Sequence, residues 1–187
     1  MTIFDRFAKY CAQRFCRFSD DEQGVSAIEF AMVLPLMVTL YLGGVEISQA
    51  VSADRKITLV TRTIADLVSQ SATISNADMT NILNASSAVA APLSAENLQV
   101  RVASVIFGAG GAMTIDWSYP SPNWSAPTMA DITNIPDSLK VEGTSLIWAE
   151  AQYNYTPAIG YVLTGTRPLT DKIFMRPRGG GTVARTS

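Results

Sequence analysis

The most unusual candidate for chemistry in this sequence is Glu29, a carboxylate inside an otherwise apolar segment. It lies five residues after Gly24, and no charged residue follows it between Phe30 and Val45. A carboxylate near the middle of a membrane span costs on the order of 3 kcal/mol on insertion scales, so it usually marks a partner or a pathway. The alternative is an interfacial position, because Glu29 is only a turn and a half from Gly24.

The other reactive side chains are few. The chain has no histidine, and its two cysteines, Cys11 and Cys16, both precede the apolar segment. Histidine is the commonest general base and the commonest metal ligand, and no second cysteine pair exists to complete a zinc site. We therefore predict no metal and interpret both cysteines as reduced thiols of a cytosolic segment, with acylation as the alternative.

No pattern in the sequence indicates catalysis. The carboxylates after the apolar segment form no pair with a signature spacing, and no Ser-x-x-Lys context occurs. The glycines at 108–111 are not followed by Lys-Ser or Lys-Thr, as a phosphate-binding loop would require. With 14 basic and 16 acidic residues, the net charge does not favour nucleic acid. We predict no enzyme, no cofactor and no small-molecule substrate.

The apolar segment from Val25 to Val45 is long enough to cross a bilayer, which requires about 20 residues in a helix. Pro35 is tolerated in membrane helices at the cost of a kink, so a bend is expected near Leu34. The 187 residues then suffice for this anchor and one ordinary domain.

The charges that flank the segment predict its orientation. Four basic residues precede it, and the first charge after it is Glu46; the basic residues are Arg6, Lys9, Arg14 and Arg17. Since basic residues of short flanks stay in the cytoplasm, the N-terminus should be cytoplasmic and the remainder exported. Two interpretations of the apolar segment itself are open at this point. It is an ordinary uncleaved anchor, or it is the core of a secretory signal peptide that is cut at "VSA" before Asp54.

The exported part begins with helical patterns. An apolar stripe continues the helix to about Ser69, and its members are Ile57, Val60, Ile64, Leu67 and Val68. A second, shorter helix is predicted after Ser75, which forms a capping box with Asp78, and Pro92 ends it.

Strand patterns follow from Leu98, where apolar residues recur with a period of two. We predict a hairpin turning at 108–111, a strand over 145–155 and a last strand around 170–175. The proline-rich segment between the hairpin and the strand over 145–155 is predicted to be a surface loop. Its Trp124 either packs on the sheet or contacts a partner. The glycine-rich tail is predicted to be flexible.

The residues of the apolar segment also carry a resemblance to a known family. Gly24, four further residues and then Glu29-Phe30 resemble the processing site of type IV pilin-like proteins, where a membrane peptidase cuts after the glycine. More specifically, "GVSAIEFAMVLPLMVTLYLGGVEIS" resembles the opening of the TadE-like family, small pseudopilins of the tight-adherence (Tad, or Flp) pilus. The later stretches "TRTIADLVSQ", "YNYTPAIGYVL" and "FMRPR" are also similar to family members.

This resemblance implies roles for four residues. A prepilin peptidase would cut between Gly24 and Val25, and Glu29 would face the terminal amine of a neighbouring subunit. Phe30 departs from the family, because processed members usually carry tyrosine after the glutamate. It keeps the aromatic ring and loses the hydroxyl, a difference that bears on the cleavage and leaves the anchor architecture intact.

We thus predict an α+β fold: a long, pilin-like N-terminal helix packed on a small antiparallel sheet, a second short helix and a flexible tail. Its parts are a cytoplasmic basic leader (1–24), a transmembrane helix (25–45), a periplasmic domain (46–178) and the tail (179–187). The predicted function is that of a pseudopilin or minor pilin of the bacterial inner membrane that assembles with other Tad pilus subunits for adhesion. The alternative is an uncleaved envelope scaffold that binds secretion or pilus components through its periplasmic domain.

Overall fold

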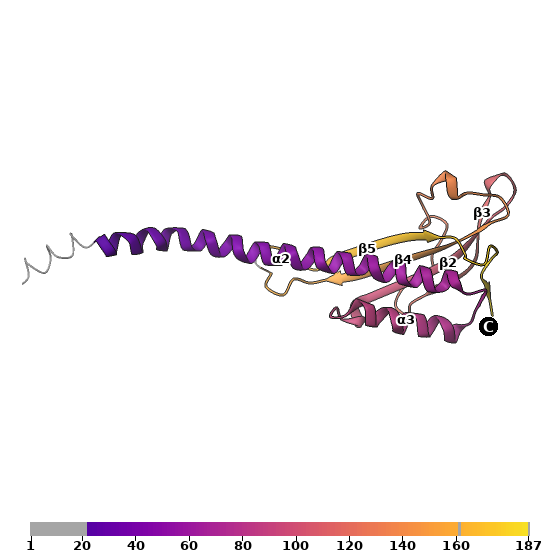
Figure 1. Cartoon of the computed structure of the whole chain (residues 1–187), viewed down its shortest axis with the longest axis horizontal. Helices are drawn as coiled ribbons and strands as arrows, with labels where there is room; N and C mark the ends of the chain where they lie inside the picture. The colour runs from indigo at the N-terminus through magenta and orange to yellow at the C-terminus, as the bar shows by residue number, and fades with distance from the viewer. Residues whose placement is uncertain (1–21, 161, 187) are drawn as a thin grey trace, which may run out of the picture. The chain divides into compact units, whose positions relative to one another are not determined.

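The computed structural model describes residues 22–160 and 162–186 (Figure 1). The chain divides into two compact units, Met1–Val45 and Glu46–Ser187, and each is described by itself. The predictions for the basic leader up to residue 21, including Cys11 and Cys16, lie outside the described residues.

One helix, α2 (Glu22–Gln70), supplies all described residues of the first unit and the opening of the second. Its described part begins at Glu22, three residues before the predicted start, and the helix continues through Pro35 and through Gly43-Gly44. The hydroxyl of Thr39 donates to the carbonyl oxygen of Pro35 at 2.8 Å, a local bond to the preceding turn.

The second unit combines the end of α2 with a second helix and a four-stranded sheet. Its further elements are β1 (Thr73–Ile74), α3 (Asn76–Ala90), η1 (Ala95–Asn97), β2 (Leu98–Phe107), η2 (Ala109–Gly111), β3 (Met113–Pro120), η3 (Asp137–Leu139), β4 (Ser145–Tyr155), β5 (Arg167–Met175) and β6 (Ala184–Arg185). The sheet has the order β3-β2-β4-β5 and every neighbouring pair in it is antiparallel. The predicted α+β class is confirmed.

Local signals in the sequence placed several elements correctly. The capping box at the start of α3 is present, since the Ser75 hydroxyl accepts from the Asp78 amide and the Asp78 carboxylate accepts from the Ser75 amide. The β2–β3 hairpin turns at the predicted glycines. The predicted last strand is real but starts earlier, at Arg167, because β4 continues to Tyr155 and gives it a pairing partner there.

The principal core lies between one face of the sheet and the helices α2 and α3 (Figure 1). From α2 it takes the predicted stripe and its neighbours, among them Ile57, Val60, Ile64 and Val68, all fully buried. From β4 it takes Ile147, Ala149, Ala151, Tyr153 and Tyr155, the residues that the alternation in the sequence placed on one face. The α2 segment in this unit is therefore held by packing rather than by helix propensity.

The opposite face of the sheet carries a smaller core. Ala103, Val105, Phe107, Leu146 and Trp148 lie there beneath Ile132 and Ile135, which come from the proline-rich loop before η3. Trp124 of the same loop is half buried, and the Arg101 guanidinium carbon lies 4.5 Å from its ring centroid. Of the two interpretations of Trp124, the structure supports the one in which it packs against the sheet.

The C-terminal segment corrects the prediction of a flexible tail for residues 183–186. Val183 is fully buried in the principal core, and its carbonyl oxygen accepts from Trp117 Nε1 at 2.6 Å. β6 pairs in parallel with β1, and Arg185 donates to Asn76 Oδ1 at 2.6 Å. The sequence offered one apolar residue after three glycines, too short a pattern to indicate a strand, yet that residue fills a core site.

Candidate functional site

The four residues singled out in the sequence lie together near the start of α2. Gly24, Val25, Glu29 and Phe30 are all exposed, and every residue from 24 to 38 shares this exposure. They lie close to Glu22, the first described residue of this helix. The structure thus places the predicted residues on neighbouring turns of one helix, where none of the described residues of that unit covers them.

The helix gives these positions a fixed spacing. Residues four apart in a helix lie one turn apart on the same face, so the backbone nitrogen of Val25 and the side chain of Glu29 share a face. The Gly24-Val25 peptide bond is itself helical, because α2 begins at Glu22. A Cβ atom added at Gly24 would meet nothing within 4 Å, so packing in this chain does not require a glycine there.

Glu29 has no counter-charge in the part of the chain that the structure describes. The ion pairs within residues 22–160 and 162–186 all lie in the second unit, and none includes Glu29. Its carboxylate therefore remains available to a group from outside these residues.

The segment around Glu29 has the properties of a membrane span. The helical stretch Gly24–Gln70 contains a window long and apolar enough to cross a bilayer by length and composition. Side chains such as Met32, Leu36 and Leu40 are more than half exposed. An apolar surface of this kind is consistent with membrane anchoring, because lipid would cover it.

A second carboxylate on α2, Glu46, is placed quite differently. Its side chain is fully buried, and Oε2 accepts from the backbone amides of Val162 and Leu163, both at 2.8 Å. These amides belong to the loop between β4 and β5. Sequence reasoning treated Glu46 only as the first charge after the apolar segment, and its neighbours 116 residues away were not visible in any local pattern.

On the outer face of the sheet, the face that carries the smaller core, Arg101 forms ion pairs with two carboxylates. Its Nε donates to Glu150 Oε2 at 2.6 Å and its Nη2 to Asp131 Oδ1 at 2.9 Å, while the guanidinium is almost fully buried. Lys172 Nζ lies 3.4 Å from Glu150 Oε1. The backbone amide and hydroxyl of Thr128, together with Arg101, lower the pKa of Asp131 to about 2. This cluster ties the proline-rich loop to the sheet.

Within the described ranges, no group of three or more histidine, cysteine or acidic side chains is arranged to hold a metal ion. The Arg101 cluster contains only two carboxylates, and both are already bonded to cationic groups.

Comparison with known proteins gives a match to the segment that contains the four residues singled out in the sequence. The family model described as TadE-like protein matches residues 24–66. The match supports assignment of the chain to the TadE-like family. It covers less than a quarter of the 187 residues and includes Gly24, Glu29, Phe30 and Glu46. Comparison with curated proteins and with solved structures gave no match.

The TadE-like assignment implies involvement in assembly of the Tad pilus and association with its components and with a membrane. The matched range begins at Gly24 and therefore contains the whole apolar segment together with part of the amphipathic continuation of α2. The predicted roles of Gly24, Val25, Glu29 and Phe30 remain predictions.

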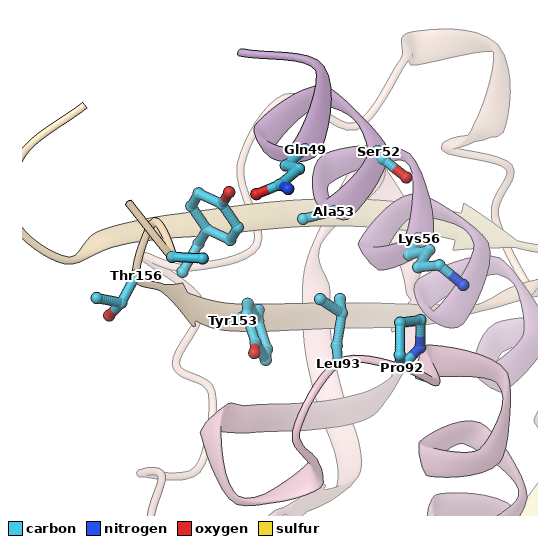
Figure 2. A pocket seen from close by; sticks show the side chains of 10 residues that line it. Gln49, Ser52, Ala53, Lys56, Pro92, Leu93, Tyr153 and Thr156 are labelled. Atoms are coloured by element: carbon cyan, nitrogen blue, oxygen red, sulfur yellow. The ribbon is translucent and has the colours of Figure 1, made fainter. Parts of the chain in front are cut away.

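The second unit also contains a pocket of about 470 Å³ (Figure 2). Gln49, Ser52 and Lys56 line it from α2, and Leu93 and Tyr153 line it from the other elements. Lys56 Nζ donates to the carbonyl oxygen of Ala91 and is therefore already engaged. The described residues that line the pocket include no carboxylate, so they offer no acid-base pair.

Proposed function

We propose that this chain is a structural subunit, a pseudopilin or minor pilin, of the Tad pilus. The observation that carries the proposal is the exposed carboxylate of Glu29 in an exposed apolar helix, within the segment that matches the TadE-like family. In this proposal residues 25–45 span the bacterial inner membrane, the N-terminus is cytoplasmic, and the α+β domain is periplasmic. The chain has no catalytic role and supports adhesion through other Tad subunits.

The physical basis is the cost of an isolated charge in lipid. A carboxylate at membrane depth is unfavourable alone, and much less so when an opposite charge is brought next to it. Cleavage after Gly24 by a prepilin peptidase creates an ammonium group on Val25. When subunits pack, Glu29 of one chain and the terminal amine of a neighbour each supply the partner that the other lacks. The pair then fixes the register between the two helices.

A second candidate function is an uncleaved envelope scaffold that holds Tad components through its periplasmic domain. The observation that favours it is the helical conformation of the Gly24-Val25 bond, because a peptidase cleft requires an extended substrate. Phe30 in place of the usual tyrosine favours it as well. In this case Met1 is retained, and Glu29 pairs with a group from another envelope protein.

The two candidates differ at a single peptide bond, so intact mass and N-terminal sequencing separate them. Protein from cells that contain the prepilin peptidase should begin at Val25, and protein from cells that lack it should retain the leader. Retention of the leader in both strains would contradict processing and leave the scaffold.

A pair of glycine variants separates recognition by the peptidase from folding. A Cβ atom added at Gly24 or at Gly44 would meet nothing within 4 Å, and both residues lie in α2. Leucine also favours helix over glycine by roughly 0.5–1 kcal/mol. We expect Gly24→Leu to abolish processing and Gly44→Leu to leave it intact. Equal processing of both variants would contradict cleavage after Gly24.

A further inference from the structure

The loop between β4 and β5, residues 156–166, has an unusual surface for an exposed connection. It contains no charged residue from Thr156 to Thr166. Two of its apolar side chains, Ile159 and Val162, are about half exposed. The loop therefore presents apolar side chains and no formal charge to its surroundings.

The loop is also held in place at a specific point. The amides of Val162 and Leu163 both donate to Glu46 Oε2 at 2.8 Å, and Glu46 is fully buried. The backbone of Val162 is therefore turned toward Glu46 while its side chain stays exposed. The bonds fix this part of the loop to one residue of α2.

The position of Glu46 in the sequence places this part of the loop near the end of the apolar segment. It follows Val45 directly, at the end of the apolar segment 25–45. At about 1.5 Å per residue, that segment is roughly 30 Å long, which equals the thickness of the hydrocarbon core. When residues 25–45 cross a bilayer, Glu46 reaches the boundary between acyl chains and headgroups, and the loop bonded to it is held near the same level.

We infer that the β4–β5 loop is a second membrane contact, in which Ile159 and Val162 insert into the lipid interface beside the end of the span. Interfacial insertion needs exposed apolar side chains and no charge at the point of entry, and the loop meets both conditions. Burial of the Glu46 carboxylate beneath the loop keeps its charge from the lipid. The occupant of this surface is thus the bilayer, and the inference rests on the membrane anchoring in the proposed function.

The test uses the full-length chain, with Cys11 and Cys16 replaced by serine, reconstituted as single copies in nanodiscs. Single cysteines carrying an environment-sensitive fluorophore are placed at Ile159→Cys and at Val162→Cys. The matched control is Val141→Cys, because Val141 is a similarly exposed apolar residue on a different loop of the same unit. Leu40→Cys, in the apolar segment and well exposed, reports insertion of the span itself.

Quenching is measured with headgroup-level nitroxide lipids and with aqueous iodide. We expect lipid quenching at positions 159 and 162 to exceed that at 141 several-fold, with a matching loss of iodide quenching. Lipid quenching no greater than at 141 overturns the inference, and shielding from iodide without lipid quenching overturns it in favour of a protein contact. If position 40 is not quenched by lipid, the anchoring in the proposed function fails; if 40 alone is quenched, only the loop contact fails.

Discussion

Two carboxylates on the same helix, Glu29 and Glu46, are treated in opposite ways by the rest of the chain. Glu46 is fully buried and accepts hydrogen bonds from Val162 and Leu163. Glu29 is exposed and has no ion pair within the described ranges. Glu46 thus has its partners within the chain, whereas the function proposed for Glu29 gives it a partner from another molecule.

The same contrast extends to the two compact units. The second unit buries further charges and satisfies them, as the Arg101 pairs with Glu150 and Asp131 illustrate. In the first unit the residues from 24 to 38 are all exposed. The predicted effects on stability should therefore fall from the buried cluster through Glu46 to Glu29.

The largest effect on stability is expected for Arg101→Met. It leaves Glu150 buried with only Lys172 near it, and breaking a buried ion pair from one side costs about 3–5 kcal/mol. Denaturant unfolding of the full chain in detergent measures the loss. The control is Lys140→Met, whose ion pair with the fully exposed Asp137 is screened by solvent and should contribute little. Equal losses for the two variants would mean that the cluster does not hold the loop on the sheet.

The next effect is expected for Glu46→Ala. It removes the carboxylate that accepts from the amides of Val162 and Leu163, and a hydrogen bond to a charged group contributes about 1.5–3 kcal/mol. The free energy of unfolding should fall by about 3 kcal/mol, and hydrogen exchange of the two amides should accelerate. Glu142→Ala, at an exposed position, should change neither quantity. A Glu46 variant as stable as the Glu142 variant would remove the contrast with Glu29.

A smaller effect depends on pH. Since the folded-state pKa of Asp131 is lowered to about 2, its stabilisation is fully present above the ordinary value of 3.8 and is lost as the pH falls from there toward 2. The carboxylate is partly exposed, so the contribution is below about 2 kcal/mol. The free energy of unfolding, plotted against pH between 5 and 2, should fall less steeply for Asp131→Asn than for the unchanged chain. Equal slopes for the two proteins would contradict the lowered pKa.

Much of this fold could be predicted from local patterns. The alternation in β4 assigned its residues to the correct faces, and Ser75 with Asp78 located the start of α3. Such features depend on neighbours in the sequence, and the periods of helix and strand make them visible. The TadE-like segment could likewise be recognised from consecutive residues.

The features that were not predicted depend on contacts between distant residues. Val183 fills a core site against Trp117, and Ile132 with Ile135 covers the outer face of the sheet. Isolated apolar residues in glycine-rich or proline-rich segments form no period, so nothing in the sequence indicated their burial. The role of Glu46 was missed for the same reason, because its donors lie on a loop far along the chain.

The central claim is that Glu29 acts in assembly and not in folding, and Glu29→Gln tests it most directly. The substitution removes the charge at an exposed position, so stability should change by less than about 0.5 kcal/mol. The decisive measurement is the amount of Tad pilus subunits that co-purify with the chain from membranes, alongside the number of pili per cell. We predict an unchanged amount of membrane-bound chain and a loss of co-purification on the order of tenfold, whereas the Glu142→Gln control keeps both. Unchanged co-purification and unchanged piliation in Glu29→Gln would contradict the claim.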